Sequence, residues 1–349
     1  MKDYTKEDSN RINLLLEISY AYYRTDADST LFFATEGKNL AEKIHYPIGF
    51  AKALRHLGIG YWVKGEYNKT IQLSQEAISI FEKYNSMEEI SRCYNTIGLV
   101  YYRKKSYEQA LKYFGKGLQI DKLYQYEQNI GIKLTNIGII YDAQQEYEKA
   151  LISLFQSLSI LEKINFRQFI PVTLSHIGEV YFHKQDYVKA ELFANKTLNA
   201  TKFSGSDREM TLAYLLLGKI AKEQKKYLQA ENFLLKSFDF ARKTKEIEHD
   251  KEVVEVLYEF YKLQKNDNKA LKYHELFKMY QDSLSSEEAE KEIKNLEFNY
   301  QIRLQEKEID LLKKENLLQE DKSKTQQLLL ITIIIVAVLI ILLDLNLRI

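Results

Sequence analysis

Three polar residues in one segment have a spacing that could serve metal binding. His176, Glu179 and His183 lie at i, i+3 and i+7, so that a helix would place them on one face. Residues at i and i+7 are about 10 Å apart along a helix axis, so three ligands on one helix rarely converge on one ion. We therefore expect these residues to line a surface, and we predict neither a metal site nor a cofactor.

Catalytic motifs give no further candidate. The sequence has no glycine-rich phosphate loop, nucleophile elbow, HExxH pair or kinase motif, and the pair Gly58 and Gly60 lies inside an apolar helical pattern. Its one cysteine, Cys93, excludes an internal disulfide framework and a multi-cysteine zinc site, and we expect it to be a buried core thiol. We predict that this chain is not an enzyme.

The composition points to helices with brief connections. The 349 residues are 45% hydrophobic and 28% charged, with a formal net charge of +1 and only two prolines and thirteen glycines. A β-rich fold needs more turn residues than this, and a balanced charge gives no field that would attract nucleic acid. We expect an all-α protein that does not bind nucleic acid.

A forty-residue repeat organises most of the chain, and it must position any binding residues. Five glycines recur at this spacing: Gly58, Gly98, Gly138, Gly178 and Gly218. A tyrosine follows three residues after the first four glycines, and another follows nine residues after all five. An alanine follows twelve residues after the last four: Ala110, Ala150, Ala190 and Ala230.

These columns fit a pair of packed helices. Leu54, Leu57, Gly58 and Tyr61 form one stripe of a helix, and a glycine within it favours close approach of a second helix. We expect the alanine column to face the glycine from that second helix. Short polar segments such as 103–106 and 143–146 then form the turns, so each copy is a helical hairpin and the copies stack.

This pattern of Gly, Tyr, turn and Ala resembles the tetratricopeptide repeat. The resemblance implies a right-handed α-solenoid of about seven forty-residue hairpins over residues 10–283, and we take 1–283 as the solenoid domain. The period is forty instead of the family's usual thirty-four, and the helix-ending proline of the family is absent.

In this fold the first helix of each hairpin lines a concave groove that can hold a protein or peptide ligand. The repeat register places both aromatic residues and a change from basic to acidic residues along this groove. The candidate groove residues are Lys52, Arg55, Trp62, Arg92, Asn95, Tyr102, Arg103, Asn136, Asp142, His176, Glu179 and Phe182.

A charged segment follows the repeats. Residues 284–327 read as one long amphipathic helix, with Ile293, Leu304, Leu311 and Leu318 on a narrow seam. The seam predicts a short coiled coil and hence a parallel homodimer. The alternative is a single solvated helix stabilised by pairs of oppositely charged side chains.

An apolar run comes next. Leu328 to Leu343 contains no charged residue, and extension to Leu347 gives about 30 Å of helix, which matches a bilayer core. We therefore predict one transmembrane helix at 328–347 with a tail at 348–349, in the inner membrane of a bacterium. Four lysines before the span predict that the repeats lie in the cytoplasm; a lost signal peptide would place them in the periplasm.

The order of repeats, charged helix and span resembles the N-terminal half of bacterial membrane sensors. In such proteins a histidine kinase or a helix-turn-helix regulator follows the span. We expect a membrane-anchored protein–protein interaction module, the sensory or peptide-binding part of a signal-transduction protein. The alternatives are a structural scaffold and the N-terminal portion of a kinase or regulator whose output domain lies outside this chain.

Overall fold

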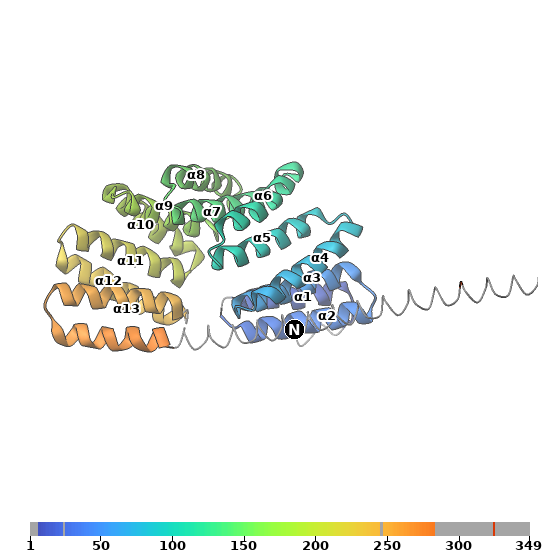
Figure 1. The fold of residues 1–349 in the computed structure, drawn as a ribbon, viewed down its shortest axis with the longest axis horizontal. Coiled ribbons are helices and arrows are strands. Elements are labelled where there is room, and N and C mark those ends of the chain that lie inside the picture. Colours follow the sequence, from blue (N-terminus) through green and yellow to red (C-terminus); the bar gives the residue numbers. More distant parts are fainter. Residues whose placement is uncertain (1–5, 24, 245–246, 283–323, 325–349) are drawn as a thin grey trace, which may run out of the picture. The chain divides into compact units, whose positions relative to one another are not determined.

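The computed structural model describes residues 6–23, 25–244, 247–282 and 324, and the residues up to 282 belong to one compact unit, Met1–Ile293. These residues contain α-helices and no strand (Figure 1). The helices are α1 (Ser9–Tyr22), α2 (Ala27–Lys43), α3 (Pro47–Val63), α4 (Tyr67–Lys83), α5 (Met87–Arg103), α6 (Tyr107–Tyr124), α7 (Glu127–Ala143), α8 (Tyr147–Lys163), α9 (Ile170–His183), α10 (Tyr187–Ser204), α11 (Asp207–Glu223), α12 (Tyr227–Thr244) and α13 (Ile247–Leu263). Residues 267–282 are also helical.

Consecutive helices pair into the seven predicted hairpins, the last formed by α13 and residues 267–282. The predicted period of forty is confirmed, since α3, α5 and α7 begin at Pro47, Met87 and Glu127. Helix α9 begins late in this register, beside Pro171, because proline fits only the first turn of a helix. The right-handed twist of the solenoid stays a prediction.

In the second to the seventh hairpin, the turn uses one residue in the left-handed conformation. Lys105, Gln145 and Gln185 have φ of 56°, 63° and 59°, and Gly65 takes the same place with φ of 74°. The amide that follows closes the turn: Ser106 N donates to Tyr101 O at 2.9 Å and Glu146 N to Tyr141 O at 2.8 Å. The polar turns predicted at 103–106 and 143–146 are therefore confirmed.

The glycine column does mark close helix contacts, but the alanine column is not its main neighbour. A Cβ atom on Gly138 would lie 2.6 Å from Leu154 Cγ and 3.2 Å from the carbonyl oxygen of Ala150. At Gly98 the equivalent neighbour is Phe114, at 2.6 Å. The expectation that the alanine side chain faces the glycine is thus corrected: Ala150 presents its backbone carbonyl to Gly138, and in both hairpins the side chain four residues after the alanine covers the glycine.

The tyrosine column is packed beneath lysines of the second helix. Lys69 Nζ lies 3.7 Å from the ring centroid of Tyr61, and Lys189 Nζ lies 5.1 Å from that of Tyr181. Lys149 lies over Tyr141 and Lys269 over Tyr261 in the same way. This cation–π contact recurs at one place in four hairpins, which explains part of the high tyrosine content.

The core is a series of clusters between neighbouring hairpins. One of them combines Leu54 of α3, Phe81 of α4 and Ile97 of α5, all of which are almost fully buried. Cys93 belongs to the same cluster, as expected, and burial raises its pKa to about 12. A thiol with such a pKa stays protonated and unreactive at neutral pH.

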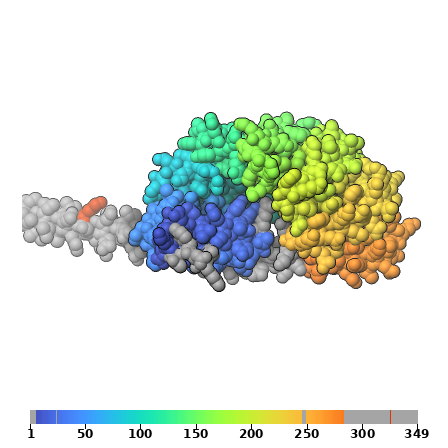
Figure 2. All heavy atoms as spheres, turned by 180° about the vertical axis from the view of Figure 1, so that it is seen from behind, coloured from blue at the N-terminus to red at the C-terminus, as the bar shows by residue number. Residues whose placement is uncertain are grey.

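One face of the stack is formed by the first helices of the hairpins. Successive odd-numbered helices contact one another, whereas successive even-numbered helices do not, so the stack bends toward the odd-numbered ones (Figure 1). We call the surface of α3, α5, α7, α9, α11 and α13 the inner face. In the space-filling view, adjacent hairpins pack without a break along the colour series (Figure 2).

Two predicted segments cannot be compared with the structure. The charged helix at 284–327, apart from Lys324, and the span at 328–347 lie outside the described residues. Within the described residues, no helix is long and apolar enough to cross a membrane.

Candidate functional site

At the α3–α5 end of the inner face, a buried ion pair joins two helices. Arg55 Nε donates to Glu89 Oε2 at 2.9 Å, and the two side chains are only 9% and 15% exposed. Burial alone would raise the pKa of Glu89, but the positive charges of Arg55, Arg92 and Lys52 outweigh it and lower that pKa. Glu89 is therefore ionised, and it holds the guanidinium of Arg55 in place.

Amide and carboxylate side chains connect α5 to α7. Asn136 Nδ2 donates to Asn95 Oδ1 at 3.0 Å. Glu88 accepts from Arg92 Nη2 at 2.7 Å and from Asn129 Nδ2 at 3.3 Å. These bonds fix the two helices side by side and leave Asn95 and Asn136 partly exposed.

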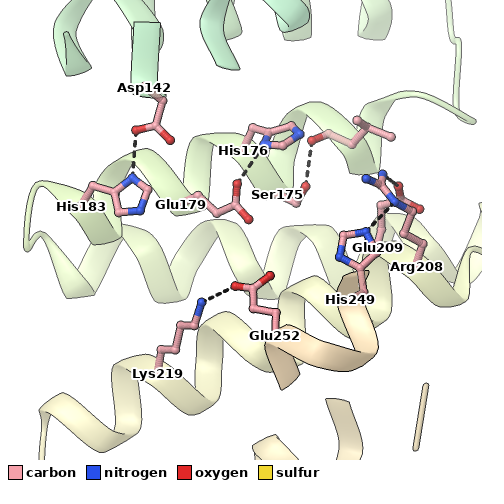
Figure 3. A network of polar contacts seen from close by, with 11 residues as sticks. Asp142, Ser175, His176, Glu179, His183, Arg208, Glu209, Lys219, His249 and Glu252 are labelled. Atoms are coloured by element: carbon pink, nitrogen blue, oxygen red, sulfur yellow. Dashed lines mark hydrogen bonds and ion pairs between the residues drawn. The ribbon is translucent and has the colours of Figure 1, made fainter. Parts of the chain in front are cut away.

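Between α7 and α9, the site contains both histidines of the spaced trio (Figure 3). His183 Nδ1 lies 2.9 Å from Asp142 Oδ1, and its hydrogen bond to that carboxylate raises the pKa of His183. His176 Nδ1 lies 2.9 Å from Glu179 Oε2. Burial acts to raise the pKa of Glu179, yet the charge and hydrogen bond of His176, with the charges of Lys219 and His183, lower it to about 2.

A further set of polar pairs connects α11 to α13 (Figure 3). Lys219 Nζ donates to Glu252 Oε1 at 2.6 Å, and Arg208 Nε donates to His249 Nε2 at 3.1 Å. The inner helices from α3 to α9 and from α11 to α13 are thus joined to one another by polar side chains.

The three predicted aromatic residues lie on this face, each partly exposed. Tyr102 and Phe182 each contact the tyrosine that begins the second helix of their own hairpin. The ring centroids are 6.3 Å apart for Tyr102 and Tyr107 and 5.6 Å apart for Phe182 and Tyr187. Trp62 is covered by Arg103 of the next hairpin, 5.7 Å from its ring. The described ring contacts thus pair each aromatic with a different neighbour, and they do not link the three rings into one ladder.

Besides the contact of Trp62 with Arg103, the structure brings eight of the predicted residues together in three groups. The charges of Lys52, Arg55 and Arg92 all act on Glu89; Asn95 and Asn136 form a pair; Asp142, His176 and Glu179 share one network with His183. No group of three potential ligands arranged for a metal ion occurs among the described residues. Each histidine of the trio has a carboxylate partner, and the two partners differ.

The sequence does not predict several residues that take part in the contacts of this face. Glu89, Asn129 and Lys219 were not expected there, although each joins two inner helices or supports a charge. A sequence signal for such pairs exists: the partners in four of these contacts are 41 residues apart, one more than the repeat. Complementary polar residues at this offset therefore mark neighbouring inner helices.

Comparison with known proteins agrees with the repeat. Residues 49–122 match the family model of the tetratricopeptide repeat. No curated protein matches the chain.

Solved structures share the fold at low sequence identity. The apo form of RapI has a TM-score of 0.61 and 19% identity, over 79% of this chain and 99% of that one. The Rap conjugation gene regulator of plasmid pLS20, in complex with the Phr* peptide, has a TM-score of 0.63 and 14% identity, over 80% of this chain and 74% of that one. NprR in complex with its cognate peptide NprX has a TM-score of 0.57 and 14% identity, over 78% of this chain and 80% of that one.

Proposed function

Because this chain is a tetratricopeptide-repeat protein, we propose that its inner face binds a peptide or an extended segment of a partner protein. The observation that carries the proposal is the arrangement of that face. Partly exposed aromatic rings and hydrogen-bonding side chains from α3, α5, α7 and α9 lie along one surface, and polar pairs hold these helices together. Two of the similar structures are complexes with peptides, which supports this choice of ligand.

The polar pairs give the face a preformed character. Side chains that are already fixed by a partner lose little entropy when a ligand binds, so more of the contact energy appears as affinity. Rings such as Trp62 and Tyr102 supply apolar contact area, and the amides of Asn95 and Asn136 can exchange their mutual bond for bonds to a ligand.

A selection from a random heptapeptide display library, with the full-length chain in detergent micelles, tests the proposal. Enriched peptides are synthesised and their dissociation constants measured by calorimetry. The variant Trp62→Ala/Tyr102→Ala/Phe182→Ala should bind them about a hundredfold more weakly, since each buried aromatic anchor contributes 1 kcal/mol or more.

The outer helices offer a matched control. Ile152, Val188 and Leu228 are 59%, 79% and 84% exposed on α8, α10 and α12. Their triple alanine variant also removes three apolar side chains, and it should leave binding unchanged. Equal losses in both variants, or no enriched peptide, would refute a binding site on the inner face.

Anchoring to a membrane is a second part of the proposed function. It rests on the sixteen uncharged residues from Leu328 to Leu343, and it would make the repeats the sensory part of a membrane signalling protein. After expression in a bacterium, the full-length chain should stay in the membrane pellet after alkaline carbonate washing. A deletion of 328–347 should release it, whereas release of the full-length chain would contradict the anchor.

A further inference from the structure

The edge of the solenoid at which one hairpin connects to the next carries exposed apolar side chains. Leu123 and Phe203 are 76% and 75% exposed, and Tyr84 and Tyr124 are 48% and 46% exposed. All four lie in the last turn of a second helix or directly after it, and Leu123 and Phe203 share one place of the repeat. We call this surface the connection edge, and its residues are 84–86, 123–126, 164–169 and 203–206.

Within two of the connections, aromatic rings stack in pairs. The ring centroids of Tyr124 and Tyr126 are 5.8 Å apart, and those of Phe166 and Phe169 are 6.3 Å apart. The turn at 104–106, at the opposite edge of the stack, contains no apolar side chain, and neither do the equivalent turns of the second to the seventh hairpin. The stacked rings are therefore a property of the connections and not of every exposed loop.

Contacts between neighbouring connections make this edge continuous. Cζ of Arg167, in the connection from α8 to α9, lies 5.6 Å from the ring centroid of Phe203 at the end of α10. Lys163 Nζ, at the end of α8, lies 2.5 Å from Glu127 Oε1 at the start of α7. Neighbouring connections are thus side by side, so their exposed apolar side chains gather on one surface. Surfaces of this kind typically mark sites of interaction with a protein or a membrane.

Lysines accompany the rings of the connection edge. Lys83, Lys122 and Lys202 are exposed in the last turns of α4, α6 and α10, and none of them forms an ion pair within the described part of the chain. Glu162 and Asp207 lie on the same edge, so its net charge is small. Aromatic rings interspersed with lysines are typical of surfaces at the boundary of a bilayer, where the rings lie among the headgroups and the lysine ammonium groups reach the water.

The described chain also leaves the solenoid at this edge. Every second helix ends at the connection edge, and the helix of residues 267–282 is the second helix of the last hairpin. Asp282 has the same place in the repeat as Lys202 at the end of α10. The apolar run that begins at Leu328 follows in the sequence after residues 283–327, so an anchor formed by this run would be attached to the solenoid at the connection edge.

We propose that the connection edge docks on the surface of the lipid bilayer, with Leu123, Tyr124 and Phe203 among the lipid headgroups. The proposal rests on the membrane anchor of the proposed function and adds a second contact of the chain with the membrane. The helices run between the two edges of the stack, so docking by one edge stands them upright on the bilayer. The inner face is formed by the sides of the odd-numbered helices, and it stays open to water and to a ligand.

Tryptophan emission of the full-length chain, reconstituted in phosphatidylcholine vesicles, tests the proposal. In a Trp62→Phe background, Phe203→Trp and Tyr124→Trp each place the single tryptophan on the connection edge. Lipids with brominated acyl chains should strongly quench both variants relative to unbrominated lipids, because the indole reaches the hydrocarbon boundary. Lys104→Trp places the tryptophan at an exposed position of the opposite edge, and its emission should stay unchanged. Equal quenching at all three positions, or none, would overturn the proposal.

A second set of variants tests whether the apolar side chains hold the edge on the bilayer. Adding Leu123→Ser/Phe203→Ser to the Tyr124→Trp variant should abolish its quenching, and it should keep the unfolding temperature because both side chains are exposed. Ile152→Ser/Val188→Ser removes two exposed apolar side chains from the outer helices instead, and it should leave the quenching as it was. Equal quenching in the two serine variants would contradict docking through the connection edge.

Salt separates insertion of the rings from attraction by charge. Because the net charge of the edge is small, quenching should persist in phosphatidylcholine vesicles as salt is added. Quenching that requires anionic lipid and is lost in salt would overturn the insertion of the rings.

Alkaline carbonate washing of the same vesicles distinguishes the failures of the two proposals. If washing releases the full-length chain, the membrane anchor is wrong and the docking that rests on it is overturned as well. If the chain stays with the vesicles but the tryptophans of the connection edge are not quenched, only the docking is overturned.

Discussion

Gly58 and Gly138 occupy the same repeat position but meet different neighbours. Above Gly138 lies Leu154, whereas above Gly58 the residue at the equivalent place is Ser74. A Cβ atom on Gly58 would meet nothing closer than 3.4 Å, against 2.6 Å at Gly138. The small residue at position 74 therefore removes the requirement for glycine in the first of these two hairpins.

This difference predicts opposite effects of one substitution. Gly138→Ala should lower the free energy of unfolding by about 1–3 kcal/mol, because the added methyl group overpacks against Leu154. Gly58→Ala should leave it unchanged or raise it by up to about 1 kcal/mol through helix propensity. Urea unfolding followed by circular dichroism measures both, and equal destabilisation by the two substitutions would contradict the packing described here.

The pair of His183 and Asp142 predicts a pH dependence. The folded-state pKa of His183 is raised above its ordinary value of 6.5, so its stabilising contribution is complete below pH 6.5 and is lost as pH rises through the raised pKa. His183 is 46% exposed, so solvent screening limits the effect to about 1 kcal/mol or less.

The measurement compares wild type with His183→Gln across pH 5 to 9. The difference in unfolding free energy should be largest at the acidic end and should shrink toward the alkaline end. A difference that grows with pH would mean that the hydrogen bond to Asp142 does not stabilise the protonated ring.

At the scale of helices, α6 and α7 are joined by a buried ion pair. Lys133 Nζ lies 2.7 Å from Asp121 Oδ2, and the side chains are 2% and 0% exposed. Ser91 of α5 donates to the same carboxylate at 2.6 Å, and the lysine passes over Gly117, where a Cβ atom would lie 2.3 Å from its Cε. Burial is the largest influence on Lys133 and lowers its pKa, against the opposing charge of Asp121.

The next hairpin has Leu161 and Thr173 at these two positions, and this gives a designed replacement. Asp121→Leu alone should destabilise the protein by about 3–5 kcal/mol, because it leaves a buried ammonium without its partner. The double variant Asp121→Leu/Lys133→Thr should recover most of that loss. A double variant as unstable as the single one would show that the ion pair is needed for more than mutual neutralisation.

At the scale of the whole molecule, the predicted homodimer depends on residues 287–324. Leucines at every seventh position are stabilised only if a partner helix covers them. In a Cys93→Ser background, Leu304→Cys and Leu311→Cys should form disulfide-linked dimers in native membranes, and Lys307→Cys should do so less. Equal cross-linking at all three positions, or none, would make the segment a solvated spacer.

The sequence alone determined the hairpin, its period and its turns. These features depend on contacts within about twenty residues, such as Gly138 with Leu154 or Lys149 with Tyr141, and such contacts repeat whenever the residue types repeat. The stripe of apolar residues, the polar turns and the glycine column therefore appear directly as periodic columns. The same columns place the candidate residues on the first helices of the hairpins, and the resemblance to the tetratricopeptide repeat predicts that these helices line a groove.

Only the tertiary structure decided which polar residues of that face are engaged and with whom. Arg55 of α3 is buried against Glu89 of α5, and His183 of α9 is hydrogen-bonded to Asp142 of α7. These pairs join different hairpins and use residue types that do not recur in every repeat. The offset of 41 residues points to possible partners such as His183 and Asp142, but it does not decide which pairs form. Which donor bonds to which acceptor depends on how closely neighbouring helices approach and how their side chains are oriented. Both are properties of the packed stack.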